Sequence, residues 1–202
     1  MATVRESTYD LLRALGLTTV FGNPGSTEEP FLRDFPDDFH YVLALHEASA
    51  VAMADGYAQA TGGAAHVNLH TAPGTGNGMG NLVTAWHNRT PLIVTAGQQT
   101  REMLLMEPRL TSRRATELPE PYVKWSHEPV RAQDVPAALM RAYATAVQPP
   151  AGPVFLSLPL DDWGQTAGPP PQVRTVATRF APDPQRLREF AAVLADSRSP
   201  AL

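Results

Sequence analysis

Three polar residues stand where short apolar stretches of the sequence end, and each could take part in chemistry. Ser26 follows a turn at 23–25, Glu47 opens an alanine-rich stretch, and His70 precedes a run of glycines. A carboxylate in apolar surroundings is costly unless it is hydrogen-bonded, paired or protonated. Glu47 could therefore hydrogen-bond a ring nitrogen of a ligand and exchange a proton with it. The alternative is a helix cap, because a helix N-terminus favours a carboxylate.

The glycine-rich segment after His70 does not fit the common phosphate-binding fingerprints. A dinucleotide fingerprint would need a glycine where Met79 stands, and a P-loop would need a glycine–lysine pair. The glycines still let the backbone approach a ligand or another chain closely, with a tight turn and a helix cap as the alternative. Ser26 is not part of a G-x-S-x-G elbow, so an acyl-enzyme serine is not expected, and helix capping is its alternative role.

Alternating strands and helices must position these residues. Strands are predicted at 18–22, 41–45, 64–69, 91–96 and 153–158, and helices at 4–15, about 26–33, 47–60, from the glycine-rich turn to about 87, and 135–147. This alternation implies an α/β fold, a three-layer sandwich with a central parallel sheet of about six strands. Ligands bind such sheets at the carboxyl ends of the strands, which is where His70 and its glycines lie.

Proline and charge are unevenly distributed along the chain. Ten of the 20 prolines fall between positions 148 and 202. We predict a domain at 1–162, a proline-rich linker at 163–183, and at 184–202 an amphipathic helix that is the truncated start of a further domain. Between positions 41 and 88 the only Asp, Glu, Lys or Arg residues are Glu47 and Asp55. That stretch is predicted to form core or a subunit interface.

Composition excludes several classes of protein. The 202 residues include no cysteine, which rules out disulfides, thiolate metal sites and a cysteine nucleophile. A net charge of -4 argues against a broad nucleic-acid-binding surface. No apolar run reaches the ~18 residues of a membrane span, and the first ten residues are polar rather than signal-like. A cytoplasmic protein without a membrane or nucleic-acid partner is the expectation.

With these residues in place, the chain resembles the N-terminal, pyrimidine-binding domain of the thiamine-diphosphate-dependent 2-oxo acid decarboxylases. The resemblance covers about residues 3–165. It rests on the order and spacing of four segments: Val20-Phe-Gly-Asn-Pro-Gly-Ser26; Leu45-His-Glu-Ala with Ala54-Asp-Gly-Tyr-Ala58; Asn68-Leu-His70 with Gly74-Thr-Gly-Asn77; and Pro91-Leu-Ile-Val-Thr-Ala-Gly-Gln98. Within the family these segments are most similar to those of the benzoylformate decarboxylases. A carboligase like the acetolactate synthases, and a noncatalytic binding or assembly module, are the alternatives.

The resemblance implies nonoxidative decarboxylation of an aromatic 2-oxo acid to an aldehyde and carbon dioxide, with thiamine diphosphate as the cofactor. Glu47 would hydrogen-bond the aminopyrimidine ring of the cofactor, His70 would transfer protons, and Ser26 would hydrogen-bond the substrate. The implied cofactor-binding residues are Asn23, Pro24, Gly25, Glu47, Gly76 and Asn77. The implied substrate pocket contains Ser26, His70 and Leu110.

The resemblance also implies metal ions and partner subunits. In the family a Mg²⁺ or Ca²⁺ ion holds the diphosphate through a Gly-Asp-Gly motif of a later domain, and this sequence lacks that motif. A second cation site carries over to Glu117, Leu118 and Glu120. Family active sites form between this domain of one subunit and the diphosphate domain of another. A homodimer or tetramer is therefore expected for the full-length protein, and this chain would hold about half of an active site.

Overall fold

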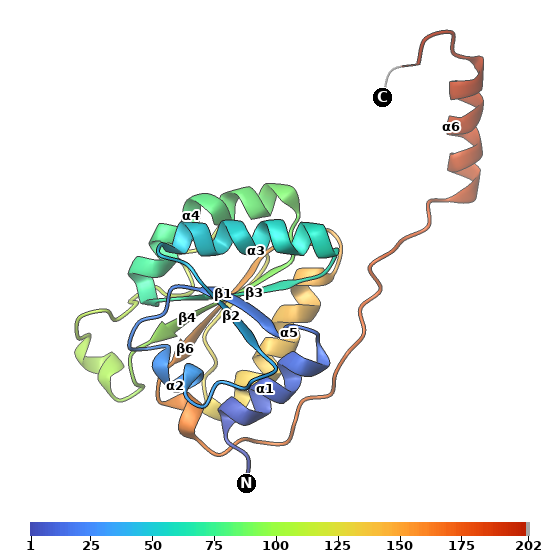
Figure 1. Ribbon diagram of the computed structural model, residues 1–202. Helices are drawn as coiled ribbons and strands as arrows, with labels where there is room; N and C mark the ends of the chain where they lie inside the picture. Colours follow the sequence, from blue (N-terminus) through green and yellow to red (C-terminus); the bar gives the residue numbers. More distant parts are fainter. Residues whose placement is uncertain (201–202) are drawn as a thin grey trace.

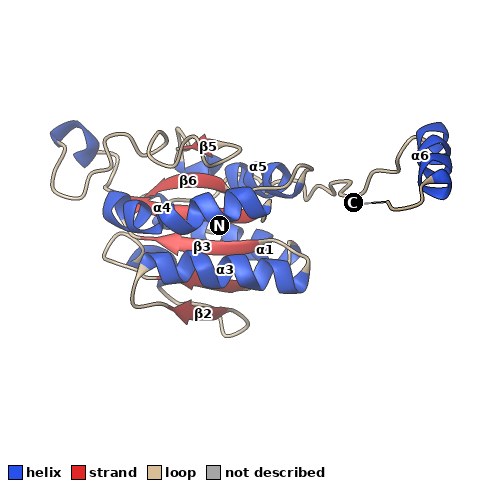
Figure 2. Cartoon of the chain, turned by 90° about the horizontal axis from the view of Figure 1, so that it is seen from above, coloured by secondary structure: helices blue, strands red, loops and turns tan. Residues whose placement is uncertain are grey.

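The computed structural model describes residues 1–200 and contains one parallel sheet. The strands lie in the order β2-β1-β3-β4-β6-β5, with β2 and β5 at the two edges (Figure 2). Their bounds are β1 (Thr19–Gly22), β2 (His40–Leu43), β3 (Ala65–Leu69), β4 (Leu92–Gln98), β5 (Ser126–His127) and β6 (Val154–Pro159). The predicted parallel sheet of about six strands is confirmed.

Helices cover both faces of the sheet, which gives three layers (Figure 1). α1 (Val4–Ala14) and α5 (Val135–Val147) pack on one face, and α3 (Glu47–Thr61) and α4 (Thr71–Asn88) pack on the other. The short helices are α2 (Glu29–Leu32), η1 (Met103–Met106), η2 (Ala132–Asp134) and η3 (Asp162–Gly164), and α6 (Pro184–Asp196) follows them. Among the helices of residues 1–200, none combines the length and apolarity needed to cross a membrane.

The glycine-rich segment is helical, so the turn predicted after His70 is wrong. α4 begins at Thr71 and includes the glycines at positions 74, 76, 78 and 80. A Cβ atom at Gly78 would lie 3.2 Å from the Cγ2 atom of Val51 on α3. Glycine is disfavoured inside a helix because it loses much backbone entropy on folding. Here the missing side chains let α4 lie close against α3, and tertiary packing overrides the local propensity.

The helix predicted at 26–33 is also wrong in its extent and its cap. α2 is a single turn whose N-cap is Glu28, and no side chain caps it. The hydroxyl group of Thr27 donates instead to the carboxylate of Glu28 at 2.7 Å. The second strand is likewise displaced from the predicted 41–45 to His40–Leu43, and Leu45 is 94% exposed.

The chain continues past the last strand with a change in packing. Trp163 of η3 is buried in the core between α1 and α5, and the N–H of Ala167 donates to the carbonyl of Ala2 at 2.9 Å. Residues 168–183 contain no helix or strand, and α6 has no buried residue. Figure 1 shows α6 apart from the sheet. The limits drawn at 162/163 and 183/184, and the assignment of 184–202 to a further domain, stay predictions.

Candidate functional site

The predicted polar residues converge because parallel strands end at one edge of the sheet. Asn23 follows β1, Glu47 lies shortly after β2, and His70 follows β3 directly. The Nδ2 atom of Asn23 lies 3.2 Å from Oε1 of Glu47, and Nδ2 of Asn77 lies 3.0 Å from Oε2. Each oxygen of Glu47 therefore accepts a hydrogen bond from a side-chain amide of a different element.

Glu47 is the first residue of α3 and is only 6% exposed. The helix cap proposed as its alternative role belongs to another residue, because Nδ1 of His46 accepts the N–H of Ala48. Burial acts to raise the pKa of Glu47, but hydrogen bonds from Asn77, its own backbone N–H and Asn23 outweigh burial and lower the pKa. At neutral pH the site presents a buried carboxylate that can accept an N–H group of a ligand.

His70 is the N-cap residue of α4, and its side chain is 20% exposed. Its Nδ1 atom lies 2.8 Å from Oε2 of Glu28 and 3.1 Å from Oγ1 of Thr27. The sequence analysis missed Glu28, whose side chain is 1% exposed. A signal was present, because Glu28 precedes the buried Phe31 by three residues, and residues three apart share a helix face.

Backbone strain is concentrated next to His70. Thr71 has φ 46°, is fully buried, and its Oγ1 atom has no hydrogen-bond partner among residues 1–200. A β-branched residue rarely adopts this left-handed conformation, which costs on the order of 1–3 kcal/mol. Such strain persists where the surrounding structure holds it, and it often marks functional sites. Here it lies exactly where β3 passes into α4, beside His70 and Glu47.

The remaining predicted ligand residues lie at the same edge of the sheet but make fewer contacts with Glu47 and His70. Gly74 packs against Glu47, since an added Cβ would lie 3.1 Å from Oε1, whereas a Cβ at Gly76 would meet nothing within 4 Å. Ser26 is exposed, and Pro24 is partly buried. Leu110 is partly buried, has φ 72°, and lies in the loop that follows β4. Neither Glu47 nor His70 makes a hydrogen bond described above to Leu110. The place of Leu110 in the substrate pocket therefore stays a prediction.

A large cavity lies elsewhere on the chain. It has a volume of about 680 Å³ and is lined by Ala64 and Pro91, at the amino ends of β3 and β4, and by linker residues within 173–178. None of the predicted site residues lines it.

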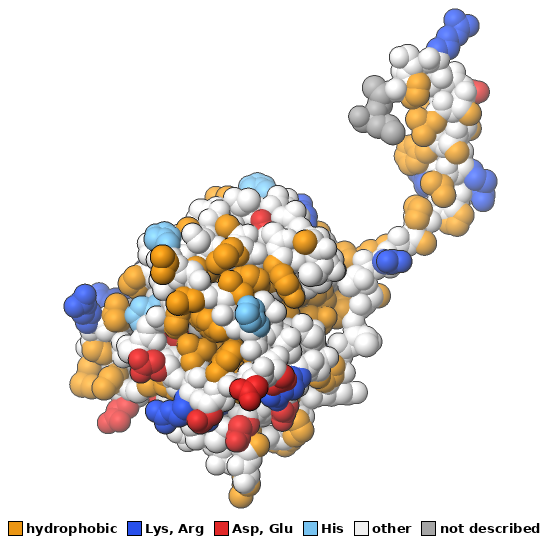
Figure 3. Space-filling model, in the orientation of Figure 1, with side chains coloured by type: hydrophobic (Ala, Val, Ile, Leu, Met, Phe, Trp, Pro, Cys, Tyr) orange, Lys and Arg blue, Asp and Glu red, His pale blue; other side chains and the backbone are white. Residues whose placement is uncertain are grey.

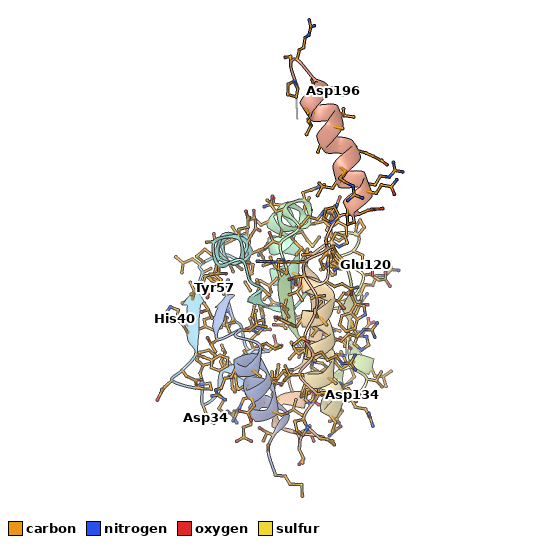
Figure 4. The ribbon with its side chains drawn as sticks, turned by 90° about the vertical axis from the view of Figure 1, so that its right-hand side faces the viewer. Asp34, His40, Tyr57, Glu120, Asp134 and Asp196 are labelled. Carbon is orange, nitrogen blue, oxygen red and sulfur yellow. The ribbon has the colours of Figure 1, made fainter. Side chains whose placement is uncertain are left out.

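At the segment predicted to lie near a second metal ion, the side chains do not gather. Glu117, Leu118 and Glu120 are all exposed, and the carboxylate of Glu117 pairs with Arg114 at 3.3 Å. Figure 4 shows Glu120 on the opposite side of the body from His40 of β2. Within residues 1–200 no group of three or more His, Cys, Asp or Glu residues could hold a metal ion. Side chains alone therefore do not form a metal site there. A cation bound mainly by backbone carbonyls of this segment stays a prediction, and we derive no chemistry from one there.

A second histidine, His66 of β3, is buried in the core. It is 2% exposed, its Nε2 atom lies 3.0 Å from Oγ1 of Thr95, and its Nδ1 atom has no partner among residues 1–200. Its ring lies 6.1 Å from that of Phe31 on α2. Burial lowers the pKa of His66 to about 4.

This lowered pKa predicts a loss of stability in mild acid. The unfolded chain, in which the histidine has its ordinary pKa of 6.5, binds the proton more readily than the folded chain. The free energy of unfolding should therefore fall as the pH drops from about 6.5 to about 4, by about 3 kcal/mol. In urea unfolding experiments, the free energy of unfolding of the His66→Gln variant should change less with pH in this range than that of the wild type. The control is His87→Gln, because His87 is exposed. Parallel profiles for His66→Gln and the wild type would contradict the prediction.

A family model and individual proteins match this chain. The model for the thiamine pyrophosphate enzyme, N-terminal TPP binding domain, matches residues 2–117. The chain is 54% identical over 207 residues to benzoylformate decarboxylase of Pseudomonas aeruginosa, covering 100% of this chain and 39% of that protein. It is 31% identical over 162 residues to the acetolactate synthase large subunit of Haemophilus influenzae, covering 77% of this chain and 27% of that protein.

Solved structures of benzoylformate decarboxylases are also similar to this chain. Benzoylformate decarboxylase from Polynucleobacter necessarius superimposes with a TM-score of 0.95 at 61% identity, over 99% of this chain and 38% of that one. The 4-hydroxybenzoylformate decarboxylase of Rhodococcus jostii RHA1 gives a TM-score of 0.92 at 48% identity, over 98% of this chain and 38% of that one. The chain thus spans about two fifths of the length of these decarboxylases.

Proposed function

Because this chain belongs to the thiamine pyrophosphate enzymes, as their N-terminal TPP-binding domain, we propose that the full-length protein decarboxylates an aromatic 2-oxo acid. The reaction releases an aldehyde and carbon dioxide without oxidation, and the substrate resembles benzoylformate. The observation that carries the proposal is the buried carboxylate of Glu47, held by two amides at the sheet edge that also carries His70. The similarity to benzoylformate decarboxylases over the whole chain supports this substrate class.

The residues at this edge fit the pyrimidine ring of thiamine diphosphate. Glu47 offers a hydrogen-bond acceptor in apolar surroundings, and Gly76 leaves open space beside Asn77. When bound, the cofactor supplies a carbon nucleophile and an electron sink, which protein side chains cannot provide. Glu47 would accept a hydrogen bond from the N–H of a protonated ring nitrogen and exchange that proton with the ring. The turn 23–25 would complete the ring site, and the Mg²⁺ or Ca²⁺ ion of the diphosphate would be held outside this chain.

The other polar residues act on the substrate. His70 is positioned to give and take protons near the reacting carbon, because its ring is partly exposed while its inner nitrogen is held in the protein. The exposed hydroxyl group of Ser26 can donate to the substrate carboxylate. Leu110 contributes apolar surface for the aryl ring. An excess of carboligation product over aldehyde would favour the alternative seen in the acetolactate synthases.

We propose that the full-length protein is a homodimer or tetramer that pairs through α3 and α4. Exposed hydrophobic side chains lie on and just before α3: Leu43 (62% exposed), Leu45 (94%), Met53 (37%) and Tyr57 (40%). Figure 3 shows hydrophobic side chains gathered on one face of the molecule. Adjacent exposed apolar side chains mark interfaces more often than free surfaces. A cytoplasmic location stays a prediction from composition.

Self-association of the chain itself is the measurable consequence. Sedimentation at high micromolar concentration should show a dimer, since the apolar side chains around α3 would otherwise stay in water. Replacing Met53 and Tyr57 by glutamate and lysine should shift the chain to monomer, whereas the same charges at exposed Arg33 and Asp37 should not. A wild type that sediments as a clean monomer would contradict the proposed interface.

Activity should require more than this chain. The 202-residue chain, given thiamine diphosphate, Mg²⁺ and benzoylformate, should release no aldehyde above the cofactor-only background, because only the pyrimidine side of the site is present. The full-length protein should release benzaldehyde and carbon dioxide under the same conditions. Enzyme-like turnover by the chain alone would refute the half-site argument. Failure of the full-length protein on every aromatic 2-oxo acid tested would refute the proposed function.

A further inference from the structure

Glu28 is a buried carboxylate that faces the imidazole of His70 and has no part in the chemistry proposed above. We propose that Glu28 is a positioning residue, which holds His70 in the tautomer with hydrogen on Nδ1. The nitrogen that exchanges protons with a ligand is then Nε2. This inference rests on the proposed function and adds to it the working atom of His70 and the group that selects that atom.

The hydrogen-bond roles around Glu28 follow from its neighbours. The backbone N–H of Gly25 lies 2.8 Å from Oε2 of Glu28, and the N–H of Gly97 lies 2.9 Å from Oε1. A backbone N–H can only donate, so both oxygens of Glu28 act as acceptors. The hydroxyl group of Thr27 donates to Oε1 at 2.7 Å. Three donors from the surrounding chain thus orient the carboxylate toward His70.

These roles decide where His70 carries its hydrogen. Nδ1 lies 2.8 Å from Oε2 of Glu28 and 3.1 Å from Oγ1 of Thr27. Since the hydrogen of the Thr27 hydroxyl points to Glu28, that oxygen turns a lone pair toward the ring. Nδ1 is therefore surrounded by acceptors and must be the donor. In a neutral imidazole the lone pair is then on Nε2.

Nε2 is also the nitrogen that remains available. Within residues 1–200 the hydrogen bonds of the His70 ring involve Nδ1 alone, and 20% of the side chain is exposed at the carboxyl edge of the sheet. A carboxylate on one imidazole nitrogen fixes the orientation of the ring and stabilises the protonated ring that forms when the other nitrogen takes a proton. Glu28 can do both for His70 without touching a ligand.

Two glycines make room for this pair. A Cβ at Gly97 would lie 2.0 Å from Oε1 of Glu28, and a Cβ at Gly25 would lie 2.4 Å from the Nδ1 and Cε1 atoms of His70. Gly97 lies inside the buried strand β4, where glycine weakens a strand unless something approaches its backbone closely. The approaching group here is the Glu28 carboxylate. Both glycines are thus explained by the space that the pair occupies.

The tautomer can be measured on this chain without any activity. In ¹⁵N-labelled chain at about pH 8, above the usual pKa of histidine, long-range ¹H–¹⁵N spectra report which ring nitrogen carries hydrogen. A His70→Gln variant identifies the His70 signals among the six histidines. We expect hydrogen on Nδ1 and a bare Nε2. Hydrogen on Nε2 in the wild type would overturn the proposal.

A substitution at Glu28 tests the cause of the tautomer. Glu28→Gln keeps the shape but offers an NH₂ group in place of one acceptor oxygen, and should shift hydrogen from Nδ1 toward Nε2. The matched control is Glu29→Gln, since Glu29 is the adjacent, exposed carboxylate and should leave the spectrum unchanged. An unchanged His70 signal in folded Glu28→Gln would overturn the proposal.

Turnover of the full-length protein completes the test. Glu28→Gln should lower turnover by at least about tenfold, because it presents the wrong tautomer, and Glu29→Gln should not change it. In a His70→Ala background Glu28→Gln should cause no further loss, since coupled residues are non-additive. An equal loss in both backgrounds would show that Glu28 acts elsewhere and would overturn the proposal. An inactive wild type would instead count against the proposed function, and the spectra would still decide the tautomer.

Discussion

Replacing Glu47 by glutamine is expected to slow turnover of the full-length protein by about 10²–10⁴-fold, the usual cost of losing one positioned acid–base group. Glutamine has the size of glutamate but cannot hold or share a proton. The carboxylate is 6% exposed and its pKa is lowered, despite burial, by hydrogen bonds from Asn77, its own backbone N–H and Asn23. It is therefore prepared to accept an N–H of the cofactor ring at neutral pH.

Two measurements on the same samples separate catalysis from stability. The first is turnover with excess thiamine diphosphate, and the second is the exchange rate of the carbon-bound proton that the cofactor loses on activation. Both should fall together in Glu47→Gln. If Glu47 served only the helix terminus, its replacement would lower stability by about 0.5–2 kcal/mol and leave both rates unchanged per folded molecule. Unchanged rates with a lowered melting temperature would remove Glu47 from the proposed chemistry.

Replacing His70 by alanine is expected to have an effect of similar size, about 10²–10⁴-fold on turnover, but at a different stage. The proton-exchange rate of the cofactor should stay near the wild-type value, because Glu47 and its two amide partners are untouched. Turnover should fall because no group remains to move protons at the substrate.

The control for His70→Ala is another exposed histidine of the same helix. His87 is exposed near the end of α4, and His87→Ala should change neither rate. Removing the His70 ring also leaves the buried carboxylate of Glu28 without one of its four partners, so stability should be measured in parallel. Cofactor-proton exchange that slows as much as turnover would contradict the division of labour between Glu47 and His70.

Much of the fold and the place of the site could be predicted from the sequence. Short apolar strands alternating with helices predicted a parallel sheet, and a parallel sheet brings the ends of its strands to one edge. Asn23, Glu47 and His70 each follow a strand, so their convergence required no knowledge of side-chain packing. The amphipathic helix after Pro184 was equally visible, because its pattern is local and periodic.

Boundaries were predicted less well where local and tertiary preferences compete. Four glycines after His70 suggested a turn, yet the segment is helical, and α4 lies close to α3. The stretch before β5 has no clear period, and its strand is only two residues long. The helix cap considered for Ser26 is missing, since α2 begins only at Glu29 and no side chain caps it.

The pairing of side chains across the site was decided by the tertiary structure alone. Glu28 and His70 are 42 residues apart, and the amides that hold Glu47 are 24 and 30 residues away from it. Periodicity and capping signals act over a few residues, so they reveal which way a side chain faces within its own element. Which partner it meets depends on how α2, α3 and α4 pack against the sheet and on the register of its strands. That is why the sequence by itself predicted which polar residues lie at the site, while only the folded chain showed which atoms of those residues are held by hydrogen bonds.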